Sequence, residues 1–161
     1  MRKQNIAFDL ITYDSIEELI GENYKLMLAA VAARKKAYAP YSNFQVGAAV
    51  LLENGEIITG NNQENASYPS GLCAERVAMF YAGANYPDVI IKSIAISATS
   101  LNYVVNKPAA PCGNCRQSLS EYEVKQKQSI TLFMMGETGE ILKCNAISDI
   151  LPLAFDSSYL N

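Results

Sequence analysis

The segment at residues 89–98 is a nearly continuous run of apolar residues, rich in isoleucine. A strand with one face in water alternates apolar and polar residues, whereas a strand covered on both faces reads as an unbroken apolar run. We therefore expect this segment to be the central strand of a sheet that has other layers packed on both faces.

Two pairs of strands are expected around it. Residues 44–52 and 56–61 are strand-like and are joined by Asn54-Gly55, a strong hairpin signal. Residues 130–135 and 140–144 flank the short link 136–139. This link favours a hairpin, because parallel strands need a connection of a dozen or more residues. Each pair should therefore be antiparallel.

The remaining segments have helical patterns. Ser15 and Glu18 form a capping box that predicts a helix continuing to about Ala37, with Gly21 as a point where it can break. Further helices are expected at residues 73–83, as a short helix after Pro111, and as a short helix near the C-terminus. The order predicts one α/β domain over residues 1–161, a three-layer α/β/α sandwich around a five-stranded mixed sheet.

Charge and composition exclude several classes of partner. The formal net charge is −3 and the pI is about 5.0, and the only basic cluster, at residues 34–36, is interpreted as a solvated helix end. We therefore expect no nucleic-acid or membrane partner. Charged residues interrupt the first 20 positions, which argues against a signal peptide or a membrane span and predicts a cytoplasmic protein.

The cysteines are the strongest chemical signal. The chain has four cysteines and no histidine, so a metal site has to be built from thiolates and carboxylates. Cys112 and Cys115 are three residues apart and share one face of a helical turn. Cys73 and Glu75 are two apart and would diverge on the side of a regular helix. The site is therefore expected over helix amino termini, where the first-turn side chains converge and thiolates are favoured.

Such a site predicts one Zn²⁺ per chain, with an acid-base group beside it. Three thiolates exceed the charge of Zn²⁺ by one, and Arg76 is placed to hydrogen-bond the sulfurs and withdraw electron density. Zinc acidifies bound water, and Glu75, left off the metal, can take a proton from that water and return it to a substrate.

Other interpretations of the same residues stay open at this point. Cys-x-x-Cys alone is also found in redox couples and in structural zinc ribbons, and Cys144 as a fourth ligand would close a non-catalytic site. Cys144 otherwise reads as a small core residue in an apolar strand. Glu75, taken alone, would be a solvated helix carboxylate.

Several segments resemble the cytidine deaminase family. Cys-Ala-Glu-Arg at 73–76 and Pro-Cys-Gly-Asn-Cys-Arg-Gln at 111–117 are similar to its two zinc signatures. Residues 39–42, 44–49, 60–66 and 151–155 match further family segments in the same order. The resemblance spans roughly residues 35–155 and leaves residues 1–14 as an N-terminal extension, either a flexible tail or part of a subunit contact.

The resemblance implies hydrolytic deamination of cytidine and 2′-deoxycytidine to uridine and 2′-deoxyuridine, with release of ammonia, in pyrimidine salvage. It implies three zinc ligands, Cys73, Cys112 and Cys115, a zinc-bound hydroxide as nucleophile and Glu75 as the proton shuttle. It also implies a homotetramer with shared active sites.

The resemblance further implies the substrate-binding residues. Asn62 and Glu64 alternate at a strand end and would hold ribose hydroxyls. Phe44, which periodicity alone would place in the core, would pack on the pyrimidine. Ala66 and Tyr68 would approach the ribose 5′ end, and Phe155 would lie near the base, with contributions from neighbouring subunits. The nearest rival is a blasticidin-type deaminase sharing the zinc signatures, and a non-catalytic zinc module is the rival from another class.

Overall fold

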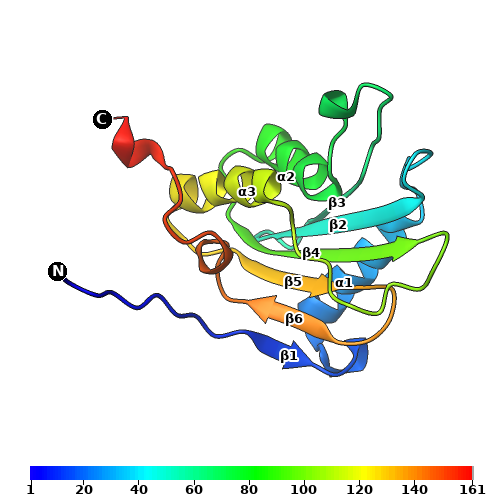
Figure 1. Cartoon of the computed structure of the whole chain (residues 1–161), viewed down its shortest axis with the longest axis horizontal. Coiled ribbons are helices and arrows are strands. Elements are labelled where there is room, and N and C mark those ends of the chain that lie inside the picture. Colours follow the sequence, from blue (N-terminus) through cyan, green and yellow to red (C-terminus); the bar gives the residue numbers. More distant parts are fainter. Residues whose placement is uncertain (161) are drawn as a thin grey trace.

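The computed structural model describes residues 1–160. Its six-stranded sheet has the order β1-β6-β5-β4-β2-β3 (Figure 1). The strands are β1 Ile11–Tyr13, β2 Phe44–Leu52, β3 Ile57–Asn61, β4 Ile91–Ser100, β5 Thr131–Met135 and β6 Ile141–Cys144. The helices are α1 Gly21–Arg34, α2 Ala74–Asn85 and α3 Gly113–Gln126, and 3-10 turns occur at Ile16–Glu18, Tyr68–Ser70, Ser148–Ile150 and Ser157–Tyr159.

The central strand is β4, as the apolar run predicted. It pairs antiparallel with β2 and parallel with β5, so the sheet is mixed. Both expected hairpins are present, because β2 pairs antiparallel with β3 and β5 pairs antiparallel with β6. The two faces of β4 contribute to different cores: Ile94 and Ile96 to one, and Ala95 to the other.

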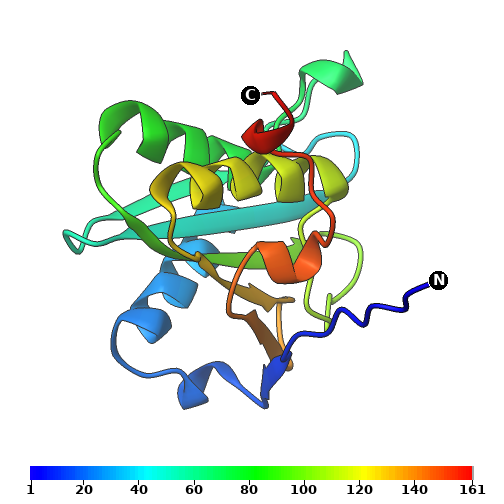
Figure 2. The ribbon, with the colours of Figure 1, turned by 90° about the vertical axis from the view of Figure 1, so that its left-hand side faces the viewer.

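The two cores define three layers. Helices α2 and α3 cover one face of the sheet and α1 covers the other (Figure 2). Ala78, Met79 and Leu119 pack on the first face, and Leu26 and Met27 pack on the second. The predicted α/β/α sandwich is therefore confirmed. No helix within residues 1–160 is long and apolar enough to span a bilayer.

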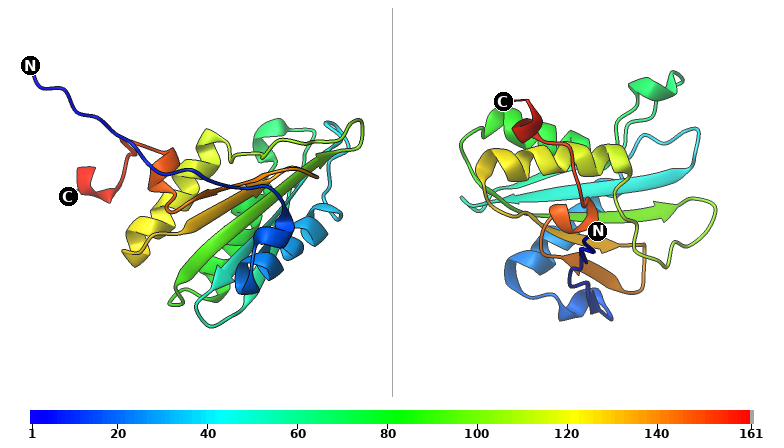
Figure 3. Two further views of the ribbon diagram at one scale, coloured as in Figure 1. Left: turned by 90° about the horizontal axis from the view of Figure 1, so that it is seen from below. Right: turned by 60° about the vertical axis from the view of Figure 1, so that its left-hand side comes forward.

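The prediction of five strands was wrong by one. β1 forms from residues assigned to the N-terminal extension, and it pairs antiparallel with β6 through Ile11–Lys143, Thr12–Leu142 and Tyr13–Ile141. Three residues at a sheet edge carry too short an alternating pattern to be recognised, and their partner lies at the other end of the chain. Residues 1–10 have no regular secondary structure and extend away from the body (Figure 3).

Three helical segments differ from expectation. The Ser15–Glu18 box forms a 3-10 turn without a side-chain cap from Ser15, and α1 begins only at Gly21, whose φ of 59° breaks the helix from the preceding turn. The helix after Pro111 was expected to be short, but α3 has 14 residues. The C-terminal region forms two 3-10 turns in place of an α-helix.

Two glycines allow helices to approach the sheet closely. A Cβ atom on Gly60 of β3 would lie 2.5 Å from the Ala78 nitrogen and 2.7 Å from the Ala74 oxygen, both in α2. A Cβ atom on Gly47 of β2 would lie 2.1 Å from the Ala30 oxygen, in α1. The two close contacts lie on opposite faces of the sheet. The Gly60 contact sets how closely the first turns of α2 approach β3.

Candidate metal centre and active site

Chain topology brings the cysteine segments to the same end of two parallel-running strands. β2 runs antiparallel to both β3 and β4, so β3 and β4 run in the same direction. α2 follows β3 and α3 follows β4, and both helices therefore begin beyond the same ends of neighbouring strands. The carboxyl ends of strands in such sheets are the usual place for a ligand site.

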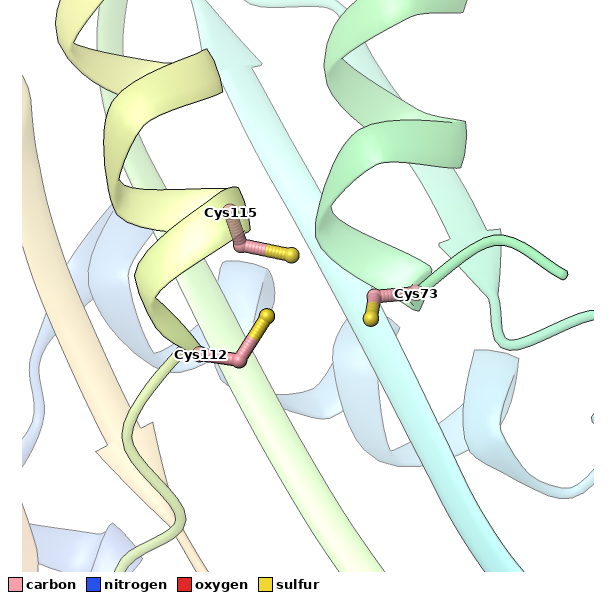
Figure 4. Close-up of side chains that lie close together, drawn as sticks. All are labelled: Cys73, Cys112 and Cys115. Atoms are coloured by element: carbon pink, nitrogen blue, oxygen red, sulfur yellow. The ribbon is translucent and has the colours of Figure 1, made fainter. Parts of the chain in front are cut away.

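Three sulfurs meet between the two helix starts (Figure 4). Cys73 is the residue before α2, Cys112 is the residue before α3, and Cys115 lies in the first turn of α3. Their Sγ atoms all lie within 4.8 Å of one another. Thiolates bound tetrahedrally to one zinc ion at about 2.3 Å lie about 3.8 Å apart, so the arrangement fits zinc after small side-chain rotations.

The charges around the sulfurs favour a thiolate at Cys73. A hydrogen bond from Cys115, with contributions from Arg76 and Cys112, lowers the pKa of Cys73 well below that of an ordinary thiol. The pKa of Cys115 is raised, because it donates to Cys73 and is buried. The Arg76 guanidinium interacts with both sulfurs. One cation is thus in place to offset part of the negative charge of three thiolates.

Glu75 is not a solvated helix carboxylate. Its side chain is only 5% exposed, and burial raises its pKa to about 7. A carboxyl group with this pKa can hold or release a proton near neutral pH, which is the requirement for an acid-base catalyst.

Cys144 lies apart from the three sulfurs. It is fully buried in the core between the sheet and α2 and α3, and burial raises the pKa of its thiol. Among residues 1–160 the close sulfur cluster consists of Cys73, Cys112 and Cys115 alone. The geometry therefore argues against a closed site with four cysteines.

A pocket of about 450 Å³ opens beside Cys73. Asn62, Glu64, Tyr68 and Arg76 line it together with Cys73, and its volume is in the range of small-molecule sites. The Asn62 side chain accepts from the Val46 backbone N–H at 2.8 Å and donates to the Phe44 carbonyl at 2.9 Å. These bonds tie the loop after β3 to the beginning of β2.

The other substrate residues implied by the resemblance lie outside this pocket. Phe44 is half-buried at the start of β2, and Ala66 is exposed in the loop after β3. Phe155 is 58% exposed and stacks on Tyr159, with ring centroids 5.3 Å apart. The single chain thus brings the three cysteines close to Asn62 and Glu64, and leaves the side chains of Phe44, Ala66 and Phe155 outside the pocket.

Two contacts of the site were not found from the sequence. The Glu64 carboxylate accepts hydrogen bonds from Tyr41 and Ser42, in a segment that matched the family but had no assigned role. Arg116 donates from Nε to the Pro111 carbonyl at 2.8 Å and from Nη1 to the Ile150 carbonyl at 3.1 Å. Arg116 thereby fixes the residue immediately before Cys112.

Comparisons with known proteins agree with this geometry. The family described as "Cytidine and deoxycytidylate deaminase zinc-binding region" matches residues 21–130. A cytidine deaminase of Halalkalibacterium halodurans is 39% identical over 137 residues, which cover 84% of this chain and 96% of that protein. One from Sporosarcina psychrophila is 36% identical over 91% of this chain and 95% of its own length.

A solved structure shows the same fold. The crystal structure of cytidine deaminase from Burkholderia pseudomallei superposes with a TM-score of 0.71 and is 41% identical in sequence. The match covers 82% of this chain and 98% of that chain.

Proposed function

The chain belongs to the cytidine and deoxycytidylate deaminase family, and from this premise we propose that it hydrolyses cytidine and 2′-deoxycytidine to uridine, 2′-deoxyuridine and ammonia. The observation that carries the proposal is the cluster of three cysteine sulfurs next to buried Glu75 and a pocket lined by Asn62 and Glu64. The family supports a zinc-dependent hydrolytic deaminase, whereas the nucleosides and the residue roles are our proposal.

In this mechanism Cys73, Cys112 and Cys115 would hold zinc, and bound zinc would acidify a water molecule so that it could act as the nucleophile. Glu75 would take one proton from that water and deliver it to ring nitrogen 3, where it stays. Glu75 would then take the proton of the new hydroxyl group on carbon 4 and deliver it to the amine, which leaves as ammonia while the carbon 4 carbonyl forms. The raised pKa of Glu75 suits both the uptake and the release of each proton. Arg76 offsets the excess negative charge of the sulfurs.

The pocket supports a nucleoside substrate better than a nucleotide. Its charged lining side chains are Glu64 and Arg76, and the Arg76 guanidinium already interacts with Cys73 and Cys115. A 5′-phosphate normally requires a free cationic or backbone donor cluster. A carboxylate and an amide, in contrast, suit ribose hydroxyls, and we assign these roles to Glu64 and Asn62.

We extend the proposal to the assembly and setting of the enzyme. Ala66, Tyr68 and Phe155 are exposed in the single chain, which suits positions that complete a neighbouring active site in a homotetramer. The four cysteines are free among residues 1–160, and free thiols of this kind suit a reducing compartment such as the cytoplasm. Pyrimidine salvage is the pathway class that consumes free cytidine.

The test is ammonia release by the purified, zinc-loaded protein. We expect turnover of cytidine and 2′-deoxycytidine, followed by the fall in ultraviolet absorbance as cytosine becomes uracil. Blasticidin S and deoxycytidylate serve as competing substrates. Preference for blasticidin S would reassign the substrate, and zinc binding without turnover of any of the four compounds would favour a non-catalytic zinc module.

A further inference from the structure

The Glu64 carboxylate lies in a cradle formed by the turn at residues 39–43. The backbone N–H groups of Tyr41 and Ser42 donate to its Oε2 atom at 2.9 and 3.2 Å. The Ser42 hydroxyl donates to Oε1 at 2.5 Å. Three donors from one short segment therefore bind both oxygens of a single side chain.

The backbone conformation of the turn directs these N–H groups toward the carboxylate. Asn43 has a φ of 57°, and its N–H donates to the Ala39 carbonyl at 3.1 Å, which closes the turn. Successive N–H groups that point into such a turn form an anion-binding concavity. The Tyr38 carbonyl accepts from the Glu64 N–H at 2.9 Å, so the backbone of the carboxylate residue is held against the same segment.

This contact leaves a defined acceptor for a ligand. An ionised carboxylate has about four lone-pair positions, and the turn occupies three of them, two on Oε2 and one on Oε1. The Ser42 hydrogen bond is also the largest cause of the lowered pKa of Glu64. Glu64 and Ser42 both line the pocket beside Cys73, so one oriented, charged acceptor remains for a hydroxyl group there.

The Ser42 hydroxyl also connects Glu64 to the beginning of β2. Its oxygen accepts from the Phe44 N–H at 3.0 Å, and the Phe44 carbonyl accepts from Asn62. The Ser42 hydroxyl thus fixes the Glu64 carboxylate relative to the first residue of β2, which Asn62 also contacts.

We propose that Ser42 is a positioning residue that sets the specificity of this site for the sugar. It orients the Glu64 carboxylate so that the free lone pair of Oε1 accepts a ribose hydroxyl. The inference rests on the proposed function, because it takes the pocket ligand to be a nucleoside. It predicts that loss of the Ser42 hydroxyl weakens binding most for substrates that carry the sugar hydroxyl bound by Glu64.

The experiment compares Ser42→Ala with Ser42→Thr on cytidine and on 2′,3′-dideoxycytidine. For Ser42→Ala we expect kcat/KM for cytidine to fall about tenfold, mainly through KM, which is the size expected for one misaligned charged hydrogen bond. We expect a much smaller fall in kcat/KM for 2′,3′-dideoxycytidine, arising only from the bond between Ser42 and the Phe44 N–H. Ser42→Thr retains a hydroxyl and should restore most of the cytidine value.

A double-mutant cycle with Glu64→Gln tests whether the effect passes through the carboxylate. If it does, adding Ser42→Ala to Glu64→Gln causes no further loss on cytidine. Equal losses on both nucleosides would show that Ser42 only supports the strand start, and an unchanged cytidine value would show that the turn alone holds Glu64. Either result overturns the proposal.

Calorimetric binding of the two nucleosides to Ser42 variants that also carry Glu75→Gln gives the same comparison without turnover. A wild-type protein that binds cytidine but does not deaminate it would refute the proposed function, and the Ser42 inference would still be decided by the binding ratios. A wild-type protein that does not distinguish cytidine from its dideoxy analogue would refute the Ser42 inference. Thermal unfolding of each variant separates these effects from loss of the folded protein.

Discussion

Substitution of Gly60 by alanine should disturb the metal centre through the packing of α2. The added Cβ would lie 2.5 Å from the Ala78 nitrogen, and ordinary contacts begin near 3.4 Å, so α2 has to retreat from β3 by about 0.9 Å. The second clash, at 2.7 Å, involves the carbonyl of Ala74, the residue next to Cys73. Overpacking of this kind costs about 1–3 kcal/mol of folding free energy.

The effect on zinc should exceed the effect on stability. Functional constellations need their groups held within about 0.5 Å, and the displacement at the start of α2 is larger. We therefore expect Gly60→Ala to weaken zinc binding by tenfold or more, while Cys112 and Cys115 at the start of α3 stay in place. Zinc affinity is measured by competition with a chromogenic chelator, and the free energy of unfolding by urea denaturation.

Gly47→Ala is the matched control, because it introduces a clash of similar kind against α1 on the other face of the sheet. Phe133→Leu, in the core under α1, is a second control that removes volume and cannot clash. Both should lower stability and leave zinc affinity close to the wild-type value. If Gly60→Ala binds zinc as well as a control of equal stability, the contact between β3 and α2 does not set the position of Cys73.

Three further predictions concern single side chains. Glu75→Gln should lower kcat about 10²- to 10⁴-fold while the zinc content and the unfolding temperature are kept, as measured by ammonia release and metal analysis; near-normal turnover would remove Glu75 as the proton carrier. Arg116→Ala should release zinc to a chelator faster than Gln117→Ala, because the Gln117 side chain donates to the Phe155 carbonyl, whereas Arg116 donates to the carbonyl of Pro111, the residue before Cys112; equal release rates would contradict this. Cys144→Ala should keep zinc and lose about 1 kcal/mol of stability from the core, and loss of zinc would support a four-cysteine site.

The central layer of the fold and the positions of the cysteines were predictable because their signals are local. The apolar run of β4 and the Asn54-Gly55 turn each indicate their structure within a few residues. The three clustered cysteines and Glu75 could be grouped because Cys112 and Cys115 share a helical turn, and because Cys73 and Glu75 can serve one site only at a helix start. These inferences depend on chemistry at short spacing, which the sequence displays directly.

The missed features depend on partners that are distant in the chain or on backbone conformation. β1 exists because Ile11–Tyr13 meets β6, and no pattern in three residues indicates that partner. Glu18 bonds the Asp14 N–H instead of capping a long helix, because the chain turns at Gly21. The partners of Glu64 could not be read from its neighbours, because they depend on the left-handed conformation of Asn43.

The pairing of β1 with β6 also affects how the molecule behaves in concentrated solution. Without β1, β6, which includes buried Ile141, would be an exposed edge strand able to pair with strands of other chains. With β1 in place, the edge strand is β1 itself, which is three residues long and is flanked by the charges of Asp9 and Asp14. Short, charged edge strands resist aggregation, so this segment would protect colloidal stability.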